Sequence, residues 1–202
     1  MPVVSKIMEA EVFCTYITEV RTYTVRTLQR RIGNKRKVAR PPQTAGLGEY
    51  SRRPPECRPD LLCRYVDDLF LLFSNEDSLN RFFTNINSVH RNIVFTKEIE
   101  TNNCLHFLDV LIKKTSTGFI TSTYRKPTHP GLYSKWSSFV PLHRKQNLVN
   151  SLLRRAYDIA SSYQLLHTEF MNIKRMLSRN GYPNNFLDRC IQQFLNRKYG
   201  VT

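Results

Sequence analysis

Two adjacent carboxylates, Asp67 and Asp68, lie between apolar runs and are the side chains of this sequence best suited to chemistry. The flanking residues 61–66 and 69–73 have the length and composition of strands buried on at least one face. The sequence therefore predicts a hairpin with both carboxylates at its tight turn. Anionic carboxylates this close repel each other unless they share a proton or bind a divalent cation. A site for Mg²⁺, with Asp67 as ligand and Asp68 as its supporting neighbour, is one interpretation.

The alternative interpretation is a solvated Asp-Asp turn that only joins two strands. This is the more common situation for a bare pair of aspartates. An aromatic residue, Tyr65, precedes the pair by one intervening position, and long apolar runs flank it on both sides. Those two features favour the metal-binding interpretation.

The elements around the hairpin predict an α+β fold. Ser74 and Asn75 can cap a helix that starts with acidic residues and continues with apolar residues at helical spacing to about residue 89. Residues 93–99, 105–112 and 119–124 have the pattern of further strands. From Pro141 onward the apolar spacing is helical and predicts three helices, the second of which ends before Gly181 and Pro183.

Tyr65-Val66-Asp67-Asp68 resembles the Tyr-x-Asp-Asp signature of reverse transcriptases. Three later runs resemble the Penelope-like retroelement reverse transcriptases in particular: IVFTKE at 93–98, LHFLDVLI at 105–112 and YRKPTHPGLY at 124–133. The resemblance extends from about Pro54 to the C-terminus. It implies a reverse transcriptase palm remnant over residues 54–138 and a thumb-like, helix-turn-helix region over residues 139–202. It also implies RNA-directed DNA synthesis with Mg²⁺ held by Asp67 and Asp68.

One part of the expected palm is missing from the sequence. Enzymes of this kind hold two metal ions between carboxylates that come from both sides, so a further Asp is required on a strand well upstream of the hairpin. The first Asp of this chain is Asp60, and no segment resembles the family's Gly-Ser-Pro motif. We therefore expect an N-terminally truncated palm that is inactive alone, with weak or absent Mg²⁺ binding.

The charge of the chain predicts a polyanionic partner. The net charge is +15, and residues 124–202 contain 13 Lys and Arg but only 3 Asp and Glu. Cations that alternate with aromatic residues can hold a phosphate backbone and stack on bases. The candidate nucleic-acid contacts are Tyr65, Arg125, Lys126, Lys135, Arg144, Lys145, Arg154 and Arg155.

Residues 1–53 are basic and remain unassigned. The cluster of Arg and Lys between residues 26 and 40 suits a nuclear-import or phosphate-binding segment, or else a solvated and partly disordered arm. The five cysteines are scattered and predict neither a disulfide framework nor a zinc site. The sequence has no apolar run long enough to cross a membrane and no secretory signal, so we expect a soluble intracellular protein, with a nuclear location as one alternative.

Three functional interpretations remain open from the sequence. The first is a reverse transcriptase fragment that binds nucleic acid without catalysis. The second is a non-catalytic nucleic-acid-binding helix-turn-helix protein that uses only its basic helices. The third is a product with no selected role.

Overall fold

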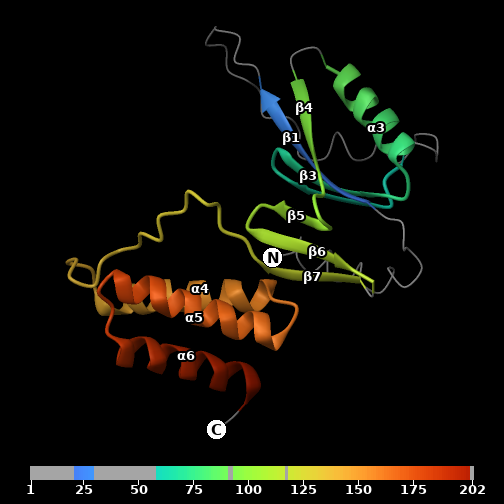
Figure 1. The fold of residues 1–202 in the computed structure, drawn as a ribbon. Helices are drawn as coiled ribbons and strands as arrows, with labels where there is room; N and C mark the ends of the chain where they lie inside the picture. Colours follow the sequence, from blue (N-terminus) through green and yellow to red (C-terminus); the bar gives the residue numbers. More distant parts are fainter. Residues whose placement is uncertain (1–20, 30–57, 91–92, 117, 201–202) are drawn as a thin grey trace, which may run out of the picture. The chain divides into compact units, whose positions relative to one another are not determined.

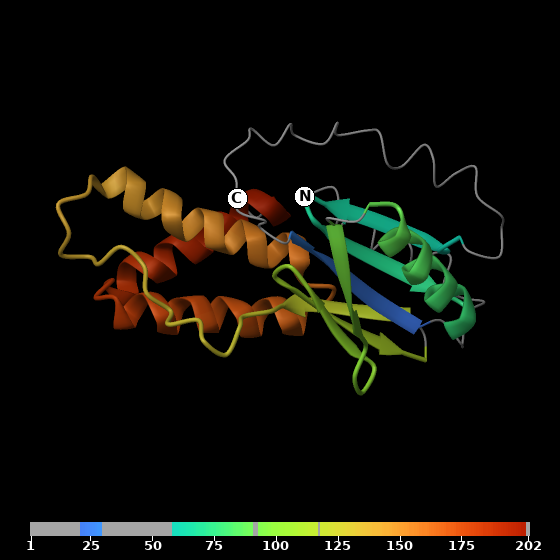
Figure 2. The same cartoon turned by 90° about the horizontal axis from the view of Figure 1, so that it is seen from above.

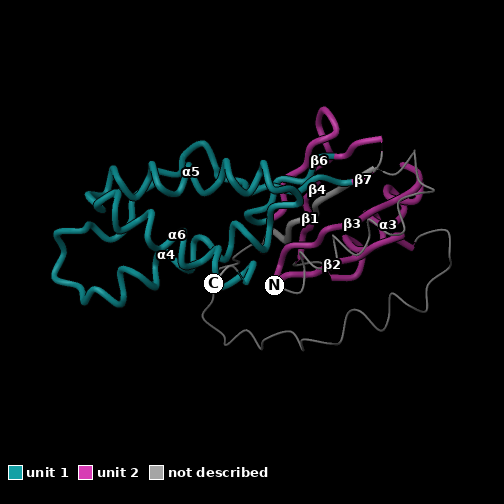
Figure 3. Tube along the Cα trace, turned by 90° about the horizontal axis from the view of Figure 1, so that it is seen from below, with its two compact units in different colours: residues 1, 108–113, 119–202 teal, residues 2–107, 114–118 magenta. Residues whose placement is uncertain are grey.

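The computed structural model describes residues 21–29, 58–90, 93–116 and 118–200. The chain divides into two compact units (Figure 3). The helical unit comprises residues 108–113 and 119–202, and the sheet unit comprises residues 2–107 and 114–118. The domain boundary that we predicted after residue 138 stays a prediction, and in this division residues 119–138 group with the helices. Apart from residues 21–29, the basic segment 1–53 lies outside the described residues.

A four-stranded antiparallel sheet forms the centre of the sheet unit (Figure 1). Its strands are β1 (Arg21–Gln29), β2 (Leu61–Tyr65), β3 (Asp68–Phe73) and β4 (Ile93–Ile99), in the order β2-β3-β1-β4. The predicted hairpin is present as β2 and β3. Its turn contains Val66 and Asp67, whereas Asp68 is already the first residue of β3 and pairs with Tyr65.

The strand β1 occupies a central position that the sequence analysis left unassigned. It pairs with β3 along one edge and with β4 along the other, both antiparallel. The main-chain groups of β3 and β4 that face β1 therefore have partners within the sheet. Residues 1–53 were left unassigned in the sequence analysis, and residues 21–29 of that segment form this strand.

The helix α3 (Glu76–Ser88) covers one face of this sheet (Figure 2). It begins as predicted, because the Asn75 side chain caps it by accepting a hydrogen bond from the backbone N–H of Ser78 at 2.7 Å. Apolar residues of α3 pack on alternate residues of β3 and form a buried core. That core contains Leu71, Phe73, Leu79, Phe82 and Ile86.

A second, three-stranded sheet has the order β5-β6-β7, with β5 (Cys104–Phe107), β6 (Val110–Thr115) and β7 (Gly118–Thr123). Residues 105–112, which we predicted as one strand, are therefore two strands joined by a turn at Leu108 and Asp109. Leu108 adopts a φ of +56° at this turn. Asp109 is the one residue of this run whose type is common in turns, and a single Asp is equally compatible with an exposed strand position, so the apolar pattern did not indicate the turn.

Three helices form the helical unit: α4 (Leu142–Ile159), α5 (Tyr163–Arg179) and α6 (Asn184–Tyr199). They pack around a shared apolar core that includes Leu153, Phe170, Leu177 and Phe194. The predicted three-helix region and the α+β fold class are thus confirmed. The turn between α5 and α6 uses Gly181 at a φ of +85°, a value at which a Cβ atom is strained.

Two buried polar residues attach the preceding chain to these helices. Thr121 of β7 donates from Oγ1 to the Ile159 carbonyl at 2.6 Å, which satisfies a main-chain acceptor at the end of α4. Asn180, at the end of α5, donates from Nδ2 to the Gly131 carbonyl at 2.9 Å and accepts from the Tyr133 N–H at 3.1 Å. Residues 119–136 are therefore part of the same packed body as the helices.

Among the described residues, no helix is both long and apolar enough to span a membrane. The described cysteines, Cys63, Cys104 and Cys190, form no disulfide. Cys14 and Cys57 lie outside the described residues.

Candidate nucleic-acid interface

The Asp-Asp hairpin presents its turn to solvent. Val66 and Asp67 are exposed, Asp68 is half-buried, and Tyr65 is about half exposed. The Arg64 side chain donates from Nε to the Val66 carbonyl at 2.9 Å, which fixes the backbone of the turn. Val66 has a φ of +55°, a conformation that is unfavourable for a β-branched residue. The hairpin therefore holds both carboxylates at one end of the sheet.

The described residues do not complete a two-metal centre around this turn. No three side chains of His, Cys, Asp or Glu in the described part of the chain come together as metal ligands would. The strand beside β3 is β1, in which Arg26 is the Cα partner of Asp68 and which contains neither Asp nor Glu. Binding of Mg²⁺ by Asp67 and Asp68 stays a prediction.

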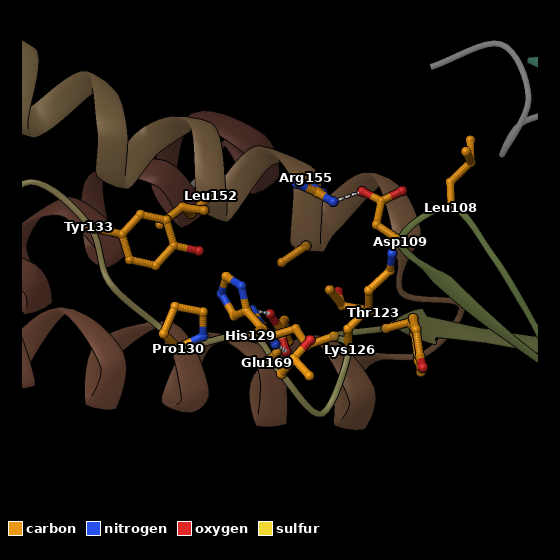
Figure 4. Close-up of a pocket in the computed structure, with 14 residues that line it drawn as sticks. Leu108, Asp109, Thr123, Lys126, His129, Pro130, Tyr133, Leu152, Arg155 and Glu169 are labelled. Carbon is orange, nitrogen blue, oxygen red and sulfur yellow. Dashed lines mark hydrogen bonds and ion pairs between the residues drawn. The ribbon is translucent and has the colours of Figure 1, made fainter. Parts of the chain in front are cut away.

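A second group of predicted residues surrounds a cavity of about 390 Å³ in the helical unit (Figure 4). Arg125 and Lys126 come from the segment after β7, and Arg155 comes from α4. The structure thus brings three of the predicted cations to one concave surface. His129 and Tyr133 also line it, with their ring centroids 6.2 Å apart in an edge contact.

Two ion pairs set the electrostatics of this cavity. Arg125 forms a bidentate pair with the buried Glu169 of α5, in which Nη1 donates to Oε2 at 2.9 Å. The hydrogen bond to Glu169 raises the pKa of Arg125 and outweighs its partial burial, so the guanidinium remains charged. Arg155 forms an ion pair with Asp109, the second residue of the β5–β6 turn.

A second cationic surface lies between α4 and α6. A groove of about 450 Å³ is lined by Arg154, Arg197 and Lys198 together with amide and hydroxyl side chains and Phe194, and its lining contains no Asp or Glu. Arg197 donates from Nη2 to the Asn150 side-chain oxygen at 3.3 Å and from Nε to the Gln193 carbonyl at 3.1 Å. Lys198 lies 4.3 Å from the centre of the Tyr157 ring. Neutral groups position these cations without cancelling their charge.

The remaining predicted contacts have different surroundings. Lys135 and Arg144 are exposed. Lys145 is only 8% exposed, and its ammonium donates to the carbonyls of Trp136 and Ser138 and lies over the Trp136 ring. The Lys145 ammonium thus stabilises the segment that contains Trp136 and Ser138, before α4, and is not available to a phosphate.

Sequence reasoning missed Arg197 and Lys198 as contacts. Both occupy the last turn of α6, where basic residues are common because they interact favourably with the helix dipole. Their spacing in the sequence carries no sign that α4 lies beside them. An available signal was the absence of any acidic residue after Asp188.

Residues 132–192 match the family model of the animal helix-turn-helix domain. The match covers α4, α5 and the first half of α6, which is less than half of the chain. The helix-turn-helix resemblance of the C-terminal region is therefore confirmed for these residues. No curated protein and no solved structure matches the chain.

Proposed function

We propose that this protein is a non-catalytic nucleic-acid-binding protein and that the groove between α4 and α6 contacts the phosphate backbone. The observation that carries the proposal is the set of three cations, Arg154, Arg197 and Lys198, around a groove without a carboxylate. The match of residues 132–192 to a helix-turn-helix family supports the same class of function. The partner is RNA or DNA, and a nuclear or other intracellular location is part of this proposal.

The groove is suited to phosphate rather than to base edges. Lys and Arg neutralise phosphates and release counterions, and such contacts carry no sequence information. The amides of Asn147 and Asn150 and the hydroxyl of Ser151 offer neutral donors beside the cations. We therefore expect binding with little base preference and a steep dependence on salt. Three phosphate contacts give a slope of log K against log salt of about −3 for duplex DNA.

The test compares two variants with the same net charge. Arg154→Gln/Arg197→Gln/Lys198→Gln removes the groove cations, whereas Arg175→Gln/Arg179→Gln/Arg189→Gln removes three exposed arginines outside it. Fluorescence anisotropy with a labelled duplex is measured across a range of KCl concentrations. We expect the salt slope of the groove variant to become shallower by about 3, and that of the control to change much less. Equal losses in both variants would mean that net charge alone accounts for binding.

A second candidate function rests on the Asp-Asp hairpin. The turn bears Tyr65, Asp67 and Asp68 at one end of a sheet that α3 covers, and the sequence around it resembles a reverse transcriptase palm. We propose that this part derives from such an enzyme, that it binds Mg²⁺ weakly or not at all, and that these 202 residues do not extend a primer. Template-dependent nucleotide incorporation by the purified chain, abolished by Asp67→Asn, would overturn this proposal.

A further inference from the structure

The cavity lined by Arg125, Lys126, His129, Tyr133 and Arg155 is separate from the α4–α6 groove in its lining residues. Its volume of about 390 Å³ is within the range of small-ligand sites, about 300–1,000 Å³. All of its lining residues belong to the helical unit. Figure 4 shows the His129 ring beside the Tyr133 phenol, and the Arg155 guanidinium directed toward the Asp109 carboxylate.

The two ion pairs of the cavity differ in how firmly they are held. The Arg125–Glu169 pair has two parallel contacts, and the Glu169 side chain is only 9% exposed. Breaking that pair would leave a buried charge, so we assign it a structural role. In the Arg155–Asp109 pair the Arg155 side chain is 47% exposed, whereas the Asp109 side chain is 19% exposed. A guanidinium that is half in solvent gains little from a single ion pair, so Arg155 can change partner at small cost.

Asp109 is the less exposed and the fixed member of the Arg155–Asp109 pair. Its carbonyl accepts a hydrogen bond from the Tyr124 N–H at 2.7 Å, and the preceding residue, Leu108, is held at a positive φ in the β5–β6 turn. The Arg155 guanidinium lies at the end of a long, flexible side chain that extends from α4. Movement of Arg155, rather than of Asp109, therefore decides whether this ion pair is open or closed.

The other lining groups fit a phosphate ester. Lys126 is exposed and adds a further cation to the lining. His129 and Tyr133 supply ring surfaces and polar atoms for the organic part of the ligand. Thr123 lines the same cavity, and its Oγ1 atom is buried without a hydrogen-bond partner among the described residues. A ligand with phosphate oxygens would provide an acceptor for each of these donors.

We propose that this cavity binds a phosphate ester and that Arg155 exchanges Asp109 for the phosphate when it binds. Asp109 then competes with the ligand, because its carboxylate pairs with the Arg155 guanidinium that the phosphate requires. The phosphate comes from a free nucleotide or from a nucleic-acid strand, since both present the same group. The proposal does not depend on binding at the α4–α6 groove.

The exchange predicts opposite effects for the two partners of one ion pair. Asp109→Asn retains the size of the side chain and removes the competing charge, so it should tighten phosphate-ester binding by up to about fivefold. Arg155→Gln should weaken binding. In the double variant the gain from Asp109→Asn should disappear, because the guanidinium for which Asp109 competes is absent.

Asp188→Asn provides the matched control. Asp188 also forms an exposed ion pair, with Lys174 at 2.5 Å, but does not line the cavity. Like Asp109→Asn, Asp188→Asn removes one carboxylate charge and one ion pair. If it tightens binding as much as Asp109→Asn does, the effect is a general one of net charge and the exchange is wrong.

The experiment measures binding to the full chain by isothermal titration calorimetry. The probes are inorganic phosphate, a nucleoside monophosphate, and a six-nucleotide single strand with or without a 5′ phosphate, and circular dichroism checks that each variant is folded. Monophosphate binding identifies a free nucleotide as a sufficient source, whereas binding of the strand alone identifies internal phosphates. Tightening by Asp109→Asn that survives the loss of all three groove cations supports the proposal. Unchanged or weaker binding by Asp109→Asn overturns the proposal without affecting the proposed groove. So does the absence of phosphate and nucleoside monophosphate binding when strand binding is unchanged in Arg155→Gln.

Discussion

Arg125, in the segment after β7, and Glu169, in the middle of α5, form a bidentate ion pair on one wall of the cavity. The pair connects two segments that are 44 residues apart in the sequence. Its carboxylate is buried, and the hydrogen bonds that satisfy it come from a single guanidinium fork.

Removing one member of this pair should cost more than removing both. Arg125→Met leaves the buried Glu169 carboxylate without its cation, and we expect the free energy of unfolding to fall by about 3 kcal/mol. In Arg125→Met/Glu169→Leu no charge is left, so part of that loss should be regained. Urea unfolding followed by circular dichroism measures both variants. A double variant less stable than Arg125→Met would show that the pair contributes net stability that an apolar replacement cannot supply.

The Asp-Asp turn stores backbone strain that a single substitution can release. Val66 has a φ of +55°, and its side chain is 70% exposed, so replacing it loses little packing. Val66→Gly should raise the free energy of unfolding of the sheet unit by up to about 1 kcal/mol, because Gly tolerates positive φ.

Val89→Gly is the control for this substitution. Val89 is also exposed, at 59%, but has a φ of −66°, which any residue adopts. There the greater freedom of Gly in the unfolded chain should lower stability by about 0.5 to 1 kcal/mol. Thermal unfolding of both variants measures the change in unfolding temperature. Equal changes of the same sign would exclude strain at Val66.

The stability of the helical unit should fall at alkaline pH because of Cys190. Burial raises the pKa of the Cys190 thiol, although Arg189 and Arg197 oppose the shift. A thiol with a raised pKa in the folded state keeps its proton after the unfolded chain has lost it. Its contribution is therefore complete below about pH 8 and is lost as the pH rises through the folded pKa.

Cys190→Ala separates this effect from other alkaline titrations. The variant loses a buried side chain and should unfold at a lower temperature at every pH. Its unfolding temperature should nevertheless decline less between about pH 8 and pH 10 than that of the wild type. The measurement is a series of melts followed at 222 nm, and parallel curves would show that Cys190 does not contribute to the alkaline loss.

Local signals in the sequence predicted the elements that depend on local contacts. The Asn75 cap, the apolar spacing of α3 and the break at Gly181 all act within a few residues, and each appears in the structure. The pairing of β1 with β3 and β4 could not be predicted in this way, because it joins segments more than 40 residues apart in the sequence. The β5–β6 turn was missed because Asp109 alone, beside Leu108 in an apolar run, is equally compatible with a continuous strand.

The same distinction applies to the candidate site. Arg125 and Lys126 are adjacent in a basic and aromatic run, and they line one cavity with Arg155. Their role as nucleic-acid contacts stays a prediction. The pairing of Arg155 with Asp109 is a tertiary contact across 46 positions and has no sequence signature. Lys145 looked like another surface cation, but the helical periodicity of α4 places it on the buried side.

The central strand β1 should be required for the sheet unit to fold. β3 is almost wholly apolar, and its residues Phe70, Leu71 and Phe73 are buried. Without β1, the main-chain groups of β3 and β4 that face it lose their partners, and an apolar strand edge becomes available for aggregation. The comparison is between a chain of residues 21–202 and one of residues 30–202, measured by size-exclusion chromatography and thermal unfolding. We expect the shorter chain to self-associate through the sheet unit while it keeps the circular dichroism of α4, α5 and α6. A monomeric 30–202 chain with a cooperative transition of the sheet unit would show that β3 and β4 pair stably without β1.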